Sequence, residues 1–204
     1  MKYAFNTVTF GGVKSWVPSY SLDETMRRLA RLGYDAMEVV CASPHAWPDY
    51  LSAEDVKRID GWQREYGIKI HSLTAAYAGR GPGYNLATAC GEELAWSRKY
   101  LKQIVDLANA WQAGTISYSA GWTGVGSTDK EARRIALESL VEIGTYAAGK
   151  GVTLCVEPSL TLSEVVDTAQ GALDMMHSSG LSNVRVMFDM EHCYNFITDP
   201  SDYV

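Results

Sequence analysis

Hydrophobic residues along this chain follow two spacings in turn. Short apolar runs rich in β-branched types predict buried strands, and longer segments with apolar residues three and four apart predict amphipathic helices. Predicted strands cover residues 3–10, 36–41, 68–77, 115–120, 152–156 and 184–188. The predicted helices lie between them, over residues 22–32, 53–66, 92–113, 129–147 and 165–178.

Polar residues mark where several of these helices begin. A Ser or Thr followed three residues later by an acid is typical of a helix N-terminus, and a glycine just past the apolar pattern is typical of a C-terminus. Such pairs are Ser21 with Glu24, Ser52 with Asp55, and Thr128 with Glu131, and the stops are Gly33 and Gly67. Residues 199–201 resemble the start of a sixth helix. Strands that alternate with helices predict a parallel α/β sheet in one domain over residues 1–204.

Two α/β architectures fit this alternation, an open doubly wound sheet and a (β/α)8 TIM barrel. A nucleotide-binding open sheet would carry a glycine-rich turn after its first strand, and residues 10–13, FGGV, do not supply one. Polar side chains at the carboxyl ends of several strands are typical of the barrel. Here those ends carry Asn6, Cys41 with His45, Thr74, Trp122, Glu157 and Asp189.

The chain is short for such a barrel, which usually needs about 250 residues. It has 204 residues and six predicted strands. An open fragment would leave two sheet edges unpaired, which proteins avoid. We therefore expect a TIM barrel truncated after its sixth strand. Either the chain is incomplete at its C-terminus, or a partner subunit closes the barrel.

Composition and charge narrow the functional classes. The chain is 47% hydrophobic, enough for a sizeable core, and its net charge is -6. The longest basic run is the pair Arg133–Arg134, which disfavours a nucleic-acid or anionic membrane partner. No apolar stretch approaches a membrane span and the N-terminus does not resemble a signal peptide, so we expect a cytoplasmic protein; a homo-oligomer is compatible with the sequence.

The cysteines do not suggest a metal site. Cys41, Cys90, Cys155 and Cys193 lie at no metal-ligand spacing. We expect reduced and mostly buried thiols without a catalytic role.

Two buried strands end on carboxylates and carry the main functional hypothesis. Glu157 follows the apolar run 152–156, and Asp189 follows the run 184–188. Acids delivered at neighbouring strand ends make a candidate metal or acid–base site. The alternatives are a structural ion pair for Glu157 and a turn cap for Asp189.

Other polar and aromatic residues have weaker signals. His45, between two prolines, either contacts a substrate or braces its loop, and Trp122 either forms an apolar wall under a sugar ring or packs in the core. Asn6 is a candidate polar contact with a substrate. Glu38, in the middle of a strand, is expected to be a buried hydrogen-bonded acid inside the barrel. His71 and His177 are expected to be structural.

Six segments give the chain a family resemblance. Together they resemble the xylose isomerase-like TIM barrels of the sugar phosphate isomerase/epimerase group, and within them the 3-epimerases. The segments span nearly the whole chain: residues 33–48 (GYDAMEVVCASPHAWP), 83–88 (GYNLAT), 92–108 (EELAWSRKYLKQIVDLA), 119–122 (SAGW), 155–158 (CVEP) and 188–192 (FDMEH).

The resemblance implies a divalent ion, Mn²⁺, Mg²⁺, Co²⁺ or Zn²⁺, held by residues at the ends of strands five to eight. Glu157 matches the ligand that also acts as one of two acid–base groups, Asp189 matches a second ligand, and His192 matches a histidine that contacts substrate oxygen. The ligands on strands seven and eight have no counterpart. A second glutamate that touches substrate in the family is Ser163 here, with Glu164 next to it.

The resemblance implies an isomerase or epimerase that removes a proton beside a ketose carbonyl and forms an enediolate. A related metal-dependent lyase, such as an inosose dehydratase, would use the same ligands. A non-catalytic or partner-completed fragment is the third alternative. The DNA endonuclease branch is disfavoured, because it needs more metal ligands and a basic groove than the four histidines and acidic balance supply.

Overall fold

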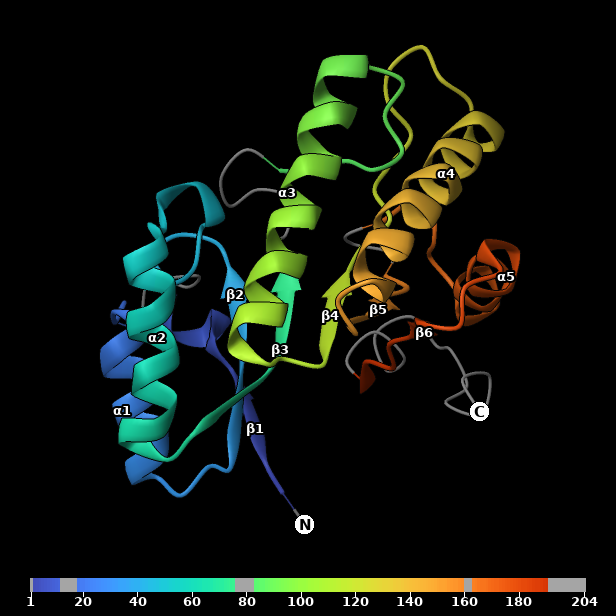
Figure 1. Ribbon diagram of the computed structural model, residues 1–204. Coiled ribbons are helices and arrows are strands. Elements are labelled where there is room, and N and C mark those ends of the chain that lie inside the picture. The colour runs from blue at the N-terminus through green and yellow to red at the C-terminus, as the bar shows by residue number, and fades with distance from the viewer. Residues whose placement is uncertain (1, 12–17, 76–82, 160–162, 191–204) are drawn as a thin grey trace.

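Six parallel strands form one sheet in which the spatial order follows the chain order (Figure 1). The computed structural model describes residues 2–11, 18–75, 83–159 and 163–190. Every strand pairs in parallel with the strand before it, which confirms the predicted α/β class. The strands are β1 (Ala4–Asn6), β2 (Ala36–Cys41), β3 (Lys69–Ala75), β4 (Thr115–Tyr118), β5 (Thr153–Val156) and β6 (Val184–Val186).

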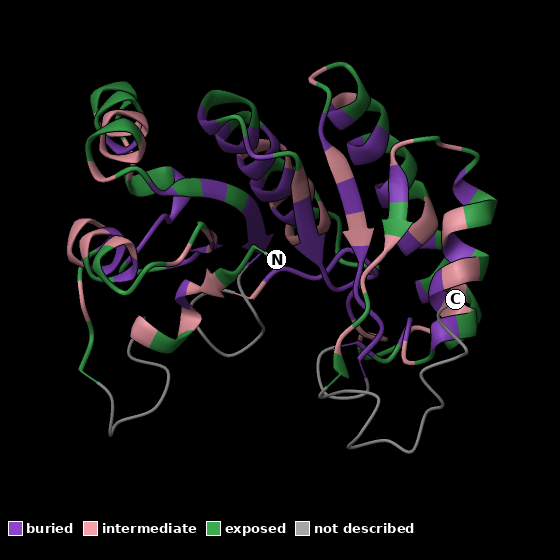
Figure 2. Ribbon diagram, turned by 90° about the horizontal axis from the view of Figure 1, so that it is seen from below, coloured by how far each residue is buried: buried purple, intermediate pink, exposed green. Residues whose placement is uncertain are grey.

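Helices connect successive strands and lie along one side of the sheet, so that the strands curve inside an arc of helices (Figures 1 and 2). The buried residues of both layers meet between them and form one continuous core. Within the described ranges no helix is both long and apolar enough to cross a membrane. The helices are α1 (Leu22–Arg31), α2 (Ala53–Tyr66), α3 (Gly91–Trp111), α4 (Asp129–Ala148) and α5 (Ala169–Ser179), with 3-10 turns η1 (Thr7–Phe10) and η2 (Pro48–Tyr50).

The predicted helix caps are present. Ser52 and Asp55 form a reciprocal capping box at the start of α2, and Gly67 ends that helix with a left-handed φ of 67°. The hydroxyls of Ser21 and Thr128 accept the third backbone N–H of α1 and α4. The start predicted at residues 199–201 lies outside the described residues.

Two element boundaries differ from the sequence prediction by four residues, and the other described boundaries differ by at most two. The first strand was expected over residues 3–10 but ends at Asn6, because the Asn6 side chain accepts the Val8 N–H and turns the chain into η1. The last helix was expected from residue 165 but begins at Ala169, because Thr168 takes the N-cap. Val165 and Val166 are buried, so the apolar signal there reflects packing of the preceding loop.

The cysteine prediction is partly wrong. Cys41, Cys90 and Cys155 are free thiols, but only Cys41 is buried, whereas Cys155 is half-buried and Cys90 is exposed as the N-cap residue of α3. Cys193 lies outside the described residues. Burial raises the pKa of the Cys155 thiol, so at neutral pH it carries its proton.

Two buried tyrosines differ in how their hydroxyls are satisfied, and this difference gives a stability prediction. The Tyr100 hydroxyl donates to the Cys41 carbonyl at 2.6 Å. The Tyr118 side chain is 3% exposed, and within the described ranges its hydroxyl has no hydrogen-bond partner. We expect Tyr118→Phe to leave the free energy of unfolding unchanged or to raise it, because a buried unsatisfied polar group is removed.

Tyr100→Phe is the matched control, because it removes the same atom but leaves the Cys41 carbonyl without its partner. It should lower the free energy of unfolding by about 1–2 kcal/mol in urea titrations. Equal losses in both variants would contradict the assignment for Tyr118.

Candidate active site at the carboxyl edge of the sheet

The two predicted carboxylates lie at neighbouring strand ends. Glu157 directly follows β5, is 2% exposed and donates its backbone N–H to the Tyr118 carbonyl at 3.0 Å. Asp189 follows β6 and is half-buried. The two segments stay paired past the strands, because the Met187 N–H donates to the Val156 carbonyl at 2.8 Å. The structure therefore brings both acids to one edge of the sheet, where the sequence placed them.

Glu38 is a third acid on the inner side of the sheet. Its two carboxylate oxygens accept from the Asn6 side-chain amide at 2.6 Å and from the Ser72 hydroxyl at 2.8 Å. Burial raises the pKa of the Glu38 carboxyl, the two hydrogen bonds oppose this, and the Asp189 charge raises the pKa further. The predicted hydrogen bonds of this acid are confirmed, whereas its side chain is half-buried and not fully buried.

Asn6 was expected to contact a substrate. In the structure its amide nitrogen is used by Glu38, and its oxygen accepts the Val8 N–H at 2.8 Å. Both ends of the side chain are therefore engaged in joining β1, β2 and η1.

His45 sits in a closed hydrogen-bond network. The Tyr20 carbonyl can only accept, so His45 Nε2, 3.1 Å away, carries the ring hydrogen. In the neutral ring Nδ1 then accepts from the Thr7 hydroxyl at 3.1 Å, and the Thr7 oxygen accepts the Val40 N–H at 3.0 Å. With both ring nitrogens used, this arrangement supports the bracing alternative for His45.

Trp122 follows β4 and is half-buried, and its backbone is hydrogen-bonded to Asn85. In the next loop Ser163 is buried and donates to the Gly121 carbonyl at 2.8 Å, whereas Glu164 is exposed.

Of the other predicted histidines, His192 lies outside the described residues. His71 and His177 are exposed on β3 and α5.

One further polar residue at this edge was missed by the sequence reasoning. Ser119 is 7% exposed at the end of β4, and within the described ranges its hydroxyl has no partner. Thr115, Ser117 and Ser119 alternate along a segment that was interpreted as simply apolar. This period-two polar pattern was the available signal for a hydrophilic inner face.

The donor chemistry of the edge suits part of a site for a divalent cation. Glu157 and Asp189 offer the carboxylate oxygens that hard cations such as Mg²⁺ and Mn²⁺ prefer. Within the ranges described, no group of three or more His, Cys, Asp and Glu side chains is close enough to hold a metal. The two acids therefore fit as two members of a larger ligand set.

Comparison with known proteins gives consistent matches. The family profile described as "Xylose isomerase-like TIM barrel" matches residues 26–203. Fructoselysine 3-epimerase of Shigella flexneri is 27% identical over 170 residues, which are 83% of this chain and 60% of that protein. The chain thus spans about 60% of the length of that curated relative.

Solved structures share the fold at low sequence identity. D-psicose 3-epimerase, crystallised in the presence of D-fructose, superimposes with a TM-score of 0.78 at 16% identity, over 96% of this chain and 65% of that one. A xylose isomerase-like TIM barrel protein from Mycobacterium smegmatis, in complex with magnesium, gives 0.70 at 16% identity, over 94% and 65% of the two chains. These likenesses confirm the TIM-barrel type of fold.

The His45 network predicts a pH dependence of stability. Burial lowers the pKa of His45 below its unfolded value, so the unfolded state binds the proton more readily. The stabilisation is therefore complete above about pH 6.5 and is lost as the pH falls toward the folded pKa, with a slope of at most ~1.4 kcal/mol per pH unit.

His45→Gln removes this titration, and urea unfolding at a series of pH values should show a shallower loss of stability on acidification than the unaltered chain. His177→Gln, at an exposed histidine on α5, should keep the original slope. Identical slopes in all three proteins would exclude His45 as the source.

Proposed function

This chain belongs to the xylose isomerase-like TIM barrel family, and on that basis we propose that it acts as a metal-dependent isomerase or 3-epimerase of a ketose or ketose derivative. The observation that carries the proposal is the buried Glu157 at the end of β5, beside Asp189 at the end of β6. The fructoselysine 3-epimerase relative and the D-psicose 3-epimerase fold neighbour support a sugar substrate.

Glu157 has the chemistry of the base. Epimerisation begins with removal of a proton from the carbon next to the ketose carbonyl, and the charge passes to the oxygens as an enediolate. A carboxylate aimed at that carbon from a buried strand end is held in one orientation and kept from bulk water, two properties that a positioned general base needs. Its backbone bond to Tyr118 fixes the height of the side chain above the sheet.

Asp189 and Glu157 would together hold the cation. A bound divalent ion would supply Lewis-acid stabilisation of the negative charge that develops on the substrate. The magnesium complex of the Mycobacterium smegmatis fold neighbour is consistent with a hard ion in this family. His192 would face the substrate beside this pair, as the family resemblance implies.

Return of the proton from the opposite face requires a second acid. The family resemblance places that acid on strands that follow β6, where it is itself one of the two remaining metal ligands. Glu157 and Asp189 are therefore proposed as one side of the complete site.

The remaining predicted contacts divide into two kinds. Trp122, half-buried at the end of β4, is proposed as an apolar wall under the sugar ring, where aromatic faces commonly pack against C–H groups. His45 and Asn6 are proposed to support the site indirectly, since their polar atoms are engaged by the protein itself.

Exchange of a ketose proton with deuterated water tests the proposal. With Mn²⁺ present and the strands that follow β6 included in the protein, NMR should show deuterium entering the carbon beside the carbonyl of a ketose such as D-fructose or D-tagatose. Glu157→Gln should slow this exchange by about 10²–10⁴-fold, because the base is lost while the shape of the side chain is kept. Glu65→Gln, which alters an exposed acid on α2, is the control and should leave the rate unchanged.

Binding of Mn²⁺, followed by electron paramagnetic resonance, gives a second readout that does not depend on turnover. It should weaken in Asp189→Asn and not in Glu65→Gln. Unchanged exchange in Glu157→Gln would refute its role, release of water from the sugar would favour the lyase alternative, and failure to bind metal or ketose would contradict the proposal.

A further inference from the structure

The loop before α3 contains a fully buried asparagine that the proposed chemistry does not use. Asn85, in the GYNLAT segment, is 0% exposed. We infer that Asn85 is a positioning residue, which sets the location of Trp122 and ties together three loops at the carboxyl edge of the sheet. This inference rests on the proposed function for its catalytic meaning, because Trp122 is the proposed wall of the sugar site.

The Asn85 side-chain amide forms hydrogen bonds with both the N–H and the carbonyl of the Trp122 backbone. Its amide nitrogen donates to the Trp122 carbonyl at 3.0 Å, and its amide oxygen accepts the Trp122 N–H at 3.2 Å. The same oxygen accepts the Ala87 N–H at 3.0 Å. A planar amide that pairs with both backbone groups of one residue fixes the position of that backbone, so the Cα–Cβ bond that carries the indole depends on Asn85.

Gly121 shows how closely the two loops approach. Its φ of +109° is unfavourable for residues with a side chain, and a Cβ added there would lie 2.2 Å from the Asn85 amide oxygen. The glycine therefore makes room for the asparagine. Gly121 also accepts the Ser163 hydroxyl at its carbonyl, 2.8 Å away, which extends the link to the loop after β5 that follows Glu157.

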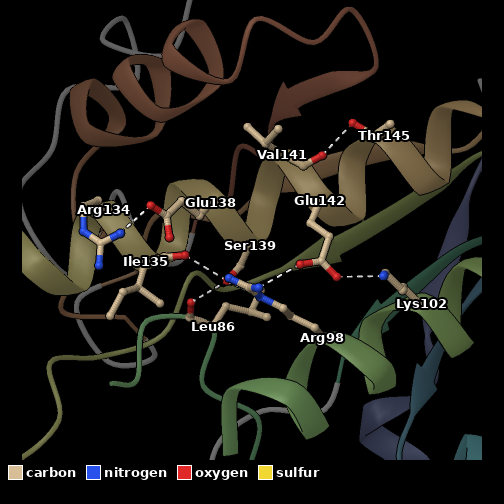
Figure 3. Close-up of polar contacts among 10 residues, drawn as sticks. All are labelled: Leu86, Arg98, Lys102, Arg134, Ile135, Glu138, Ser139, Val141, Glu142 and Thr145. Carbon is tan, nitrogen blue, oxygen red and sulfur yellow. Dashed lines mark hydrogen bonds and ion pairs between the residues drawn. The ribbon is translucent and has the colours of Figure 1, made fainter. Parts of the chain in front are cut away.

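The Asn85 loop is itself anchored on two helices. The Asn85 N–H donates to the Ser97 hydroxyl of α3 at 3.0 Å. The Ser139 hydroxyl of α4 shares its hydrogen between the Leu86 carbonyl at 2.9 Å and the Ile135 carbonyl at 2.8 Å. Arg98 of α3 donates to the same Ser139 oxygen at 3.0 Å (Figure 3). These bonds attach the loop to α3 and α4, and they therefore fix the position of the Asn85 amide beside Trp122.

A second asparagine in the chain separates positioning from general stabilisation. The Asn183 amide nitrogen donates to the carbonyls of Gly144 and Val152, both at 3.0 Å. It therefore also joins distant backbone segments, but it does so just before β6, at the amino edge of the sheet. Loss of Asn183 should lower stability without moving Trp122.

Fluorine NMR of the full chain tests the inference without any need for catalysis. We would incorporate 5-fluorotryptophan and assign the Trp122 resonance with Trp122→Phe. Asn85→Asp and Asn85→Ala should shift or broaden this resonance, and Asn183→Ala should leave it in place. An unmoved Trp122 resonance in folded Asn85→Asp, which keeps the size of the side chain, would overturn the inference.

Titration with D-fructose measures how the same variants affect ketose binding. The Asn85 variants should weaken apparent ketose binding about tenfold, and Asn183→Ala should not. The defect of Asn85→Asp relative to the unaltered chain should shrink as the pH falls, because a protonated carboxyl regains the hydrogen that the Trp122 carbonyl accepts.

The two proposals fail in different ways. If the unaltered chain binds no ketose, the proposed function fails while the fluorine spectra still decide the role of Asn85. If the unaltered chain binds ketose and Asn85→Asp and Asn183→Ala weaken it equally, Asn85 serves stability alone and the inference is overturned.

Discussion

Parallel pairing at the carboxyl ends of β4, β5 and β6 is the constraint on which the rest of the site depends. Tyr118 O accepts from Glu157 N, and Val156 O accepts from Met187 N, so each strand fixes the height of the acid that follows its neighbour. Side-chain positions alternate between the two faces of a strand, and a shift of one residue would therefore turn Glu157 toward the helices. The apolar residues under the helices, such as Leu154 and Val156, resist that shift because it would expose them.

Local signals were sufficient for most of the fold. The strand at 36–41 and the capped start of α2 were predicted at the positions found, because burial periodicity and capping act over a few residues. The predicted end of the first strand was wrong because a side chain competed with the hydrogen bonds between strands: the Asn6 oxygen accepts the Val8 N–H and ends β1 early. At α5 the buried pair Val165–Val166 imitated a helical stripe although it belongs to a loop.

In the candidate site, too, some features could be predicted from local sequence and others depend on contacts between distant residues. Glu157 and Asp189 could be predicted because each follows an apolar run, and the topology of a parallel sheet then places them at one edge. The role of His45 could not be decided, since it depends on Thr7 and Tyr20, whose proximity only the folded chain creates. Asn85 lies in the GYNLAT segment that contributed to the family resemblance, but its bonds to Trp122 could not be predicted, because the two residues are 37 positions apart.

The agreement between spatial order and chain order in the sheet has a consequence for how this protein forms. Each described strand after β1 pairs with the strand one β–α unit earlier in the sequence, so every pairing closes a loop of a single such unit. During synthesis each unit can dock on the one already made, so the edge that carries the acids would be built progressively, with β5 in place as a template before β6 leaves the ribosome.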